Sequence, residues 1–104
     1  MPNKYRAQRT RVGNVVYASR REAEYAEELH LRQRAGEVLT IEIQVPYELI
    51  PRPNLVKYVA DFRVTFKDGR QEVHEVKGME TAVWKIKEKL FRHRYPHIPL
   101  RVIR

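Results

Sequence analysis

The chain of 104 residues contains no cysteine, so it can form neither a disulfide nor a thiolate site for zinc. No apolar run approaches the ~20 residues that a membrane-spanning helix needs. The opening residues, Met1–Lys4, are not followed by the apolar stretch of a secretory signal. Low-complexity tracts and internal repeats are also lacking. We therefore expect one globular domain, since domains contain on the order of 100–150 residues.

Acidic residues are the scarcer charge: 13 Asp and Glu stand against 21 Lys and Arg, which gives a net charge of +8. This excess predicts a polyanionic partner, and nucleic acid is the commonest one. A membrane surface is less favoured, because no segment is a basic amphipathic helix with a Trp, Phe and Leu face. The alternative is a basic protein without such a partner.

Two helices are indicated by their capping residues. Ser19 is a candidate N-cap and forms a capping box with Glu22, while Gly36 ends the helix after Ala35. Thr81 is the N-cap of a second helix, in which apolar residues recur at helical spacing up to Tyr95. One strand is expected over residues 37–44 that resumes over residues 47–50 after a bend or a sheet edge at Pro46. Further strands are expected over residues 55–66, 70–77 and 100–103.

The α-β-β-β-α-β order of these elements predicts an α/β fold in which two helices flank a small mixed sheet. Residues 1–17 are expected to form a basic N-terminal arm, and residues 18–104 the single folded domain. The front of this arm either follows phosphates or is a frayed terminus.

The dipeptide Asp68–Gly69 predicts a hairpin between residues 55–66 and 70–77. A two-residue loop places Asp61 opposite Val76, and a three-residue loop places it opposite Glu75. In both cases Asp61 lies beside Glu75 and Lys77, which are two residues apart and share one face.

Two carboxylates and an amine in this arrangement suit a hard cation. Mg²⁺ sites typically use one or two carboxylates together with waters and substrate phosphates. Asp61 and Glu75 could bridge such an ion, while Lys77 could orient the attacking water or stabilise developing negative charge. The alternative is an ordinary hairpin with an exposed acid and a Glu–Lys pair.

The segments 59–62 (Val-Ala-Asp-Phe) and 75–78 (Glu-Val-Lys-Gly) resemble the core of the PD-(D/E)xK nuclease superfamily. The predicted order of elements matches that core, although Ala60 stands where the motif can have proline. Residues 19–25, Gln44 before the proline, and residues 85–91 are similar to small phage-associated members, among which are Holliday-junction resolvases. The resemblance covers nearly the whole chain after Ser19, and its specificity comes from the order and spacing of short motifs.

The resemblance implies that Asp61 and Glu75 are metal ligands, that Val76 lends a backbone carbonyl to the metal, and that Lys77 is the catalytic lysine. Glu22 would reach the site from the first helix, close to a second metal or its water. Its competing role is that of the capping-box acid.

A further set of residues is expected to contact nucleic acid: Arg20, Arg21, Gln44, Lys85 and Lys87. Gln44 could instead be a polar residue satisfied at a strand bend, and the two lysines could belong to a solvated helix face. The histidines are expected to be structural or surface residues: His30, His74, His93 and His97.

The function implied is that of a Mg²⁺-dependent endonuclease, with Mn²⁺ able to substitute, that hydrolyses phosphodiester bonds in branched DNA. A resolvase makes two symmetric cuts, so a homodimer is implied as well. Alternatives are a nicking or restriction-type endonuclease and a non-catalytic DNA-binding module of the same fold. The expected location is cytoplasmic, in a bacterial host cell if the protein is phage-encoded.

Overall fold

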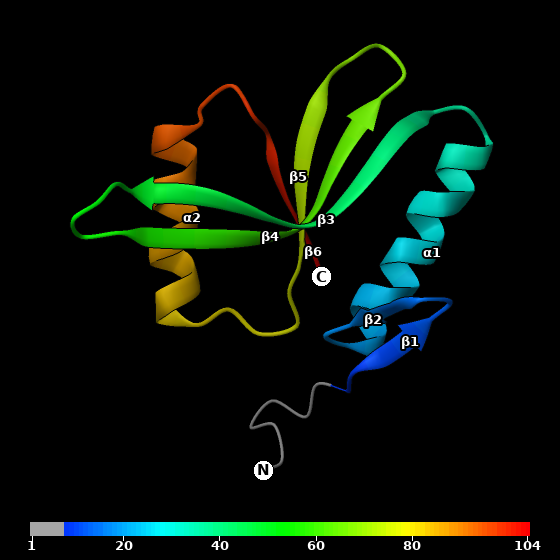
Figure 1. Ribbon diagram of the computed structural model, residues 1–104, viewed down its shortest axis with the longest axis horizontal. Coiled ribbons are helices and arrows are strands. Elements are labelled where there is room, and N and C mark those ends of the chain that lie inside the picture. The colour runs from blue at the N-terminus through cyan, green and yellow to red at the C-terminus, as the bar shows by residue number, and fades with distance from the viewer. Residues whose placement is uncertain (1–7) are drawn as a thin grey trace.

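The computed structural model describes residues 8–104, which form two helices, a four-stranded sheet and a small two-stranded sheet (Figure 1). The helices are α1 (Arg20–Arg34) and α2 (Ala82–Arg94). The strands are β1 (Thr10–Val12), β2 (Val15–Tyr17), β3 (Val38–Ile50), β4 (Val56–Phe66), β5 (Gln71–Val76) and β6 (Leu100–Ile103). After the β1–β2 hairpin the order is α1-β3-β4-β5-α2-β6, which confirms the predicted succession and the α/β class.

The large sheet has the strand order β3-β4-β5-β6. Strands β3, β4 and β5 pair antiparallel, whereas β6 lies parallel to β5, so the sheet is mixed as predicted. The two strand segments predicted around Pro46 form one continuous strand, β3. Proline is tolerated there because β3 is an edge strand. The irregularity lies two residues earlier, at Gln44, whose φ of 52° is in the left-handed region.

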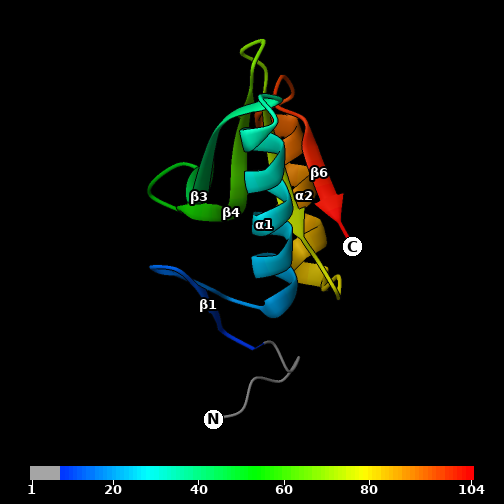
Figure 2. The same cartoon turned by 90° about the vertical axis from the view of Figure 1, so that its right-hand side faces the viewer.

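Two cores lie at opposite ends of the long β3–β4 hairpin, one beside each helix (Figures 1 and 2). The core beside α1 contains Tyr17, Ala23, Tyr25, Ala26, Leu29, Val38, Phe62, Val64 and Phe66. The core beside α2 contains Val45, Tyr47, Leu49, Tyr58, Ala60, Val73, Trp84, Phe91 and Leu100. Residue 61 of β4 therefore lies at the junction of the two cores, since Ala60 belongs to one and Phe62 to the other.

The helix ends follow from local sequence. Ser19 Oγ accepts a hydrogen bond from the Glu22 amide at 3.1 Å, and Thr81 Oγ1 accepts one from the Trp84 amide at 3.1 Å. Gly36, with φ of 85°, follows the end of α1. The predicted caps Ser19, Thr81 and Gly36 are thus confirmed, but the capping box is only half formed, because the Glu22 carboxylate accepts from Gln44.

The apolar residues of α2 do not all face the core. Trp84 and Phe91 are buried, but Val83 and Ile86 are 63% and 59% exposed. Trp84 and Phe91 are seven residues apart, so one narrow stripe of the helix faces the sheet.

The β4–β5 hairpin has the three-residue loop. Phe62 pairs with His74, and the Phe66 amide donates to the Arg70 carbonyl at 2.8 Å. Gly69, with φ of 91°, supplies the left-handed residue that such a loop contains. Of the two registers left open by the sequence, the structure has the one that places Asp61 opposite Glu75.

Part of the predicted N-terminal arm is folded. Residues 10–17 form the β1–β2 hairpin, and Tyr17 is buried in the core beside α1. The front of the arm, residues 1–7, lies outside the described residues. No helix within residues 8–104 is long and apolar enough to span a membrane.

Candidate active site

Asp61 and Glu75 are held together by the hairpin and by hydrogen bonds to its backbone. Asp61 Oδ2 accepts from the Val76 amide at 2.9 Å, and Glu75 Oε1 lies 3.4 Å from the Asp61 amide nitrogen. Glu75 is buried, and its Oε1 also accepts a hydrogen bond from the Tyr58 hydroxyl at 2.5 Å. Both carboxylates are therefore fixed by donors on one side.

Lys77 follows directly after β5, and its amide donates to the Ile103 carbonyl at 2.9 Å. Its ammonium lies 3.4 Å from Glu75 Oε2 and 4.8 Å from the centroid of the Trp84 ring. A cation over an aromatic face gains attraction from the ring quadrupole. These two contacts hold the Lys77 amine beside the carboxylates.

Glu22 reaches the same place from the first turn of α1, where only 5% of the residue is exposed. Its Oε1 accepts a hydrogen bond from Gln44 Nε2 at 3.3 Å. The amide of Glu22 serves the Ser19 cap, while its carboxylate is directed to Gln44. Gln44 therefore supports an acid of the site, although the sequence suggested it as a nucleic-acid contact.

Burial and mutual repulsion raise the pKa values of two acids of the site, Asp61 and Glu22. Burial raises the pKa of Asp61, and the charges of Glu75 and Glu22 raise it further, against the opposing effects of the Val76 amide and Lys77. Burial and the charge of Glu75 likewise raise the pKa of Glu22. A bound cation would relieve this repulsion.

The donor set fits one kind of metal site. Within residues 8–104 no group of three or more His, Cys, Asp or Glu side chains is arranged to hold a metal ion by itself. Asp61 and Glu75 form a pair of carboxylates with the repulsion just described. Such a pair suits Mg²⁺, which usually keeps several waters, and does not form a cage made of protein ligands alone. Val76 lines the same cavity and contributes its amide to Asp61.

The carboxylates lie in a cavity of about 580 Å³, whose wall includes Arg21 at the α1 side. A second cavity of about 290 Å³ shares Glu75 and Lys77 with the first and is also lined by Lys57 and Lys87. The salt bridges among the described residues do not involve any of the cations Arg21, Lys57 and Lys87. The acids are thus flanked by positive charge that is available to an anionic ligand.

The predicted nucleic-acid contacts divide into two groups. Arg21 and Lys87 line the two cavities, whereas Arg20 and Lys85 line neither of them. Lys57 was not singled out from the sequence. Period-two alternation along β4 places it on the face of Asp61, so a signal for it was present.

Tyr58 had no comparable signal, because alternation assigns it to the apolar face of β4. None of the four histidines is among the residues that line the two cavities beside Asp61 and Glu75. His74 is buried in hydrogen bonds to Tyr25 and Glu72, and His30 is a surface residue beside Gln33.

Residues 2–104 match the model of a family described as a protein of unknown function, DUF1064, so the chain belongs to that family. No curated protein and no solved structure matches the chain.

Proposed function

We propose that this protein is a metal-dependent endonuclease of the PD-(D/E)xK type, with a restriction-endonuclease-like core. One observation carries the proposal: Asp61, Glu75 and Glu22 converge from β4, β5 and α1 in one cavity, with the Lys77 amine 3.4 Å from Glu75. Of the described cations, only Lys77 forms a salt bridge with any of these three carboxylates. Acids that repel one another in a cavity mark a functional site.

Each residue has a distinct role in the proposed reaction. Asp61 and Glu75 would hold the ion, and Glu22 would accept hydrogen bonds from its water shell. The chemistry supplied by bound Mg²⁺, or Mn²⁺ in its place, is a lowered pKa of water and neutralisation of phosphate charge. Lys77 is placed to donate a hydrogen bond to the attacking water or to a phosphate oxygen.

Two residues would keep this geometry rigid. The Tyr58 hydroxyl fixes one oxygen of Glu75, and the Val76 amide fixes one oxygen of Asp61. Because one oxygen of each carboxylate is held in this way, the direction of the second oxygen is set as well, and that of Glu75 lies 3.4 Å from the Lys77 ammonium. A carbonyl contribution from Val76 to the ion belongs to the same proposal.

The proposed substrate is DNA, because cations that form no salt bridge with any described residue lie on both sides of the acids. Arg21 lies on the α1 side, and Lys57 and Lys87 lie on the side of α2. Contacts of this kind recognise the phosphate backbone and the shape of the DNA, and they do not distinguish one base sequence from another. A preference for branched DNA, such as a Holliday junction, is proposed from the resemblance to small phage-associated nucleases, and binding through phosphates and shape is compatible with it. Two symmetric cuts then require a homodimer. The proposed cytoplasmic location in a bacterial cell goes with that substrate.

A second candidate, a DNA-binding module without catalysis, is favoured by one observation. Although three carboxylates line the cavity, no three His, Cys, Asp or Glu side chains of the described residues are arranged to hold a metal ion, so the site could bind phosphates through its lysines alone. In that case divalent cations would have no effect on DNA bound by the protein.

The test uses labelled four-way junctions, flaps, nicked duplexes and linear duplexes incubated with Mg²⁺ or Mn²⁺. We expect cleavage by the wild type, no cleavage by Asp61→Asn, and wild-type cleavage by Asp68→Asn. Asp68 is a suitable control because it is an exposed acid of the same hairpin, paired with Arg70. Cleavage that survives Asp61→Asn would show that the site is wrongly assigned. Binding without cleavage by the wild type would favour the second candidate. Analytical ultracentrifugation tests the dimer.

A further inference from the structure

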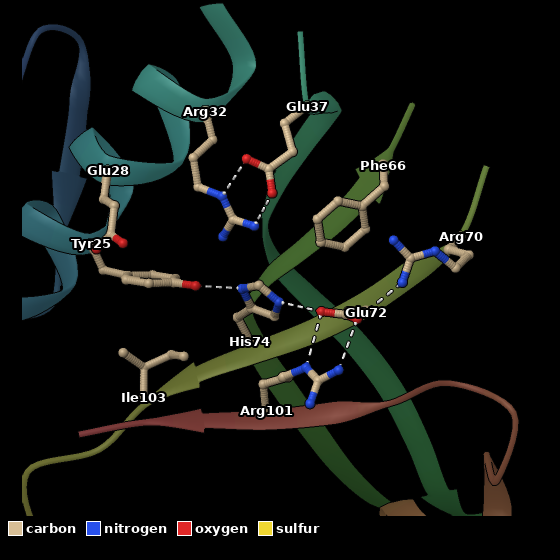
Figure 3. A pocket seen from close by; sticks show the side chains of 10 residues that line it. All are labelled: Tyr25, Glu28, Arg32, Glu37, Phe66, Arg70, Glu72, His74, Arg101 and Ile103. Carbon is tan, nitrogen blue, oxygen red and sulfur yellow. Dashed lines mark hydrogen bonds and ion pairs between the residues drawn. The ribbon is translucent and has the colours of Figure 1, made fainter. Parts of the chain in front are cut away.

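A separate cavity of about 500 Å³ lies between α1 and strands β5 and β6, with a chain of buried polar groups in its wall (Figure 3). The Tyr25 hydroxyl lies 2.6 Å from His74 Nδ1, and His74 Nε2 lies 3.0 Å from Glu72 Oε1. All three residues are at most 8% exposed. The chain links α1 to β5 over 49 residues of sequence.

The direction of these hydrogen bonds follows from their chemistry. A carboxylate can only accept, so His74 Nε2 carries the proton and donates to Glu72. His74 Nδ1 is then the acceptor, and Tyr25 donates to it. Burial lowers the pKa of His74 despite the nearby Glu72 charge, which keeps the ring neutral.

Glu72, at one end of this series of hydrogen bonds, is held by two arginines. Arg101 on β6 donates to both oxygens of Glu72, at 3.2 and 3.3 Å, and Arg70 lies 3.8 Å away. The third arginine of this cavity, Arg32, is paired with Glu37 at 2.6 Å. Because each guanidinium already has a carboxylate partner, this wall is better suited to holding elements together than to binding a ligand (Figure 3).

Tyr25 shares a helix face with one acid of the candidate site and contacts the sequence neighbours of the other two. It lies one helical turn from Glu22, on the same face of α1. Its ring packs edge to face on Phe62, beside Asp61, with centroids 5.7 Å apart. Its hydroxyl bonds to His74, the residue before Glu75.

We propose that Tyr25 is a positioning residue which, through His74, sets the separation of α1 from β5 and so places Glu22 against Asp61 and Glu75. The inference rests on the proposed function, because it gives Glu22 a role at a cation site. Outer groups that orient metal ligands typically contribute 10–100-fold to metal affinity. Tyr25 would act at this level, without touching the ion.

The test measures the dissociation constant of Mn²⁺ alone by calorimetry. Tyr25→Phe keeps the ring on Phe62 and removes only the hydroxyl, and we expect it to weaken Mn²⁺ binding about tenfold. Tyr95→Phe is the matched control, since it removes a hydroxyl that donates to the Glu48 carbonyl at 2.8 Å near the other helix. It should change Mn²⁺ affinity less than twofold.

A double-mutant cycle separates positioning from general loosening of the fold. In the Glu22→Gln background, Tyr25→Phe should change Mn²⁺ affinity less than twofold, because the residue through which it acts is already altered. An equal loss in both backgrounds, or no loss in the wild-type background, would overturn the positioning role. Wild-type protein that binds no Mn²⁺ would instead overturn the proposed function itself. If Tyr25→Phe does not fold, His74→Gln replaces it, because an amide nitrogen at the place of Nε2 can still donate to Glu72, while no acceptor atom then stands at the place of Nδ1, which bonds to Tyr25.

Discussion

Replacing Asp61 with asparagine should stabilise the metal-free protein, although it removes a residue of the candidate site. Asparagine keeps an oxygen that can accept from the Val76 amide, so that hydrogen bond at 2.9 Å is retained. What is lost is a charge beside Glu75 and Glu22, whose repulsion raises the pKa of Asp61 in addition to the effect of burial. The variant therefore removes a cost that the folded wild type carries.

The magnitude follows from the pairing of the two strands. Residues that face each other across antiparallel strands have Cβ atoms about 5 Å apart. Two unit charges at that distance repel by roughly 3 kcal/mol at an effective dielectric constant of 20. Partial exposure of Asp61 and the attraction of Lys77 reduce this cost, and we expect about 1–2 kcal/mol. For a domain of this size, such a gain raises the Tm by about 5–10 °C.

The size of the Tm difference between Asp61→Asn and the wild type depends on pH. Folding raises the pKa of Asp61 above its unfolded value of about 3.9. Below that value the carboxyl is protonated in both states, so the wild type and Asp61→Asn should differ little. As pH rises, the wild type loses stability until the folded-state pKa has been passed, while asparagine does not titrate. The Tm difference should therefore grow from near zero at pH 4 to its full value in mildly alkaline buffer.

The assay is thermal unfolding of chelator-treated protein, followed by circular dichroism between pH 4 and pH 9. Asp68→Asn is a control of opposite sign, because hydrogen bonds from Arg70 lower the pKa of Asp68, so its charged form favours folding. Added Mg²⁺ should raise the Tm of the wild type and have little effect on Asp61→Asn. A Tm difference that is negative at pH 8, or the same at every pH, would refute the electrostatic reasoning.

Three further predictions concern the lysines and the first helix. Lys77→Met should lower single-turnover cleavage by about 10²–10³-fold while DNA affinity, measured in Ca²⁺, changes far less; equal losses in both would assign Lys77 to binding. Lys57→Gln and Lys87→Gln should each reduce the slope of log K against log salt by about 0.9, whereas Lys67→Gln in the remote hairpin loop should leave the slope unchanged. Ser19→Ala should cost about 1 kcal/mol in urea unfolding through loss of the helix cap, and a neutral result would mean that the 3.1 Å bond to the Glu22 amide contributes nothing.

Local features were predictable because short stretches of chain determine them. Ser19, Thr81 and Gly36 act within one turn of their own helix, and alternation along β4 assigned its buried face correctly. The proximity of Asp61 to Glu75 was predictable for the same reason, since a tight hairpin joins them. Their role as ligands remains a prediction.

The hairpin register was ambiguous, because Asp68–Gly69 suits both loop lengths. A slip of one residue turns every side chain to the other face, so burial of Phe62 against α1 selects the register. The exposure of Val83 and Ile86 could not be predicted either, since helical spacing indicates which face of a helix is apolar but not how much of that face is buried.

The sequence by itself determined the helices, the strands, their order and the proximity of Asp61 to Glu75 and Lys77, because these depend on neighbours along the chain or on one tight turn. Only the tertiary structure brought Glu22 to these residues and tied Tyr25 to His74 across 49 positions. It also placed the Tyr58 hydroxyl on Glu75 and brought Lys57 and Lys87 to the wall of a cavity that Glu75 lines as well. The physical reason is that such contacts depend on how α1 and α2 pack on the sheet, and no local pattern records that packing.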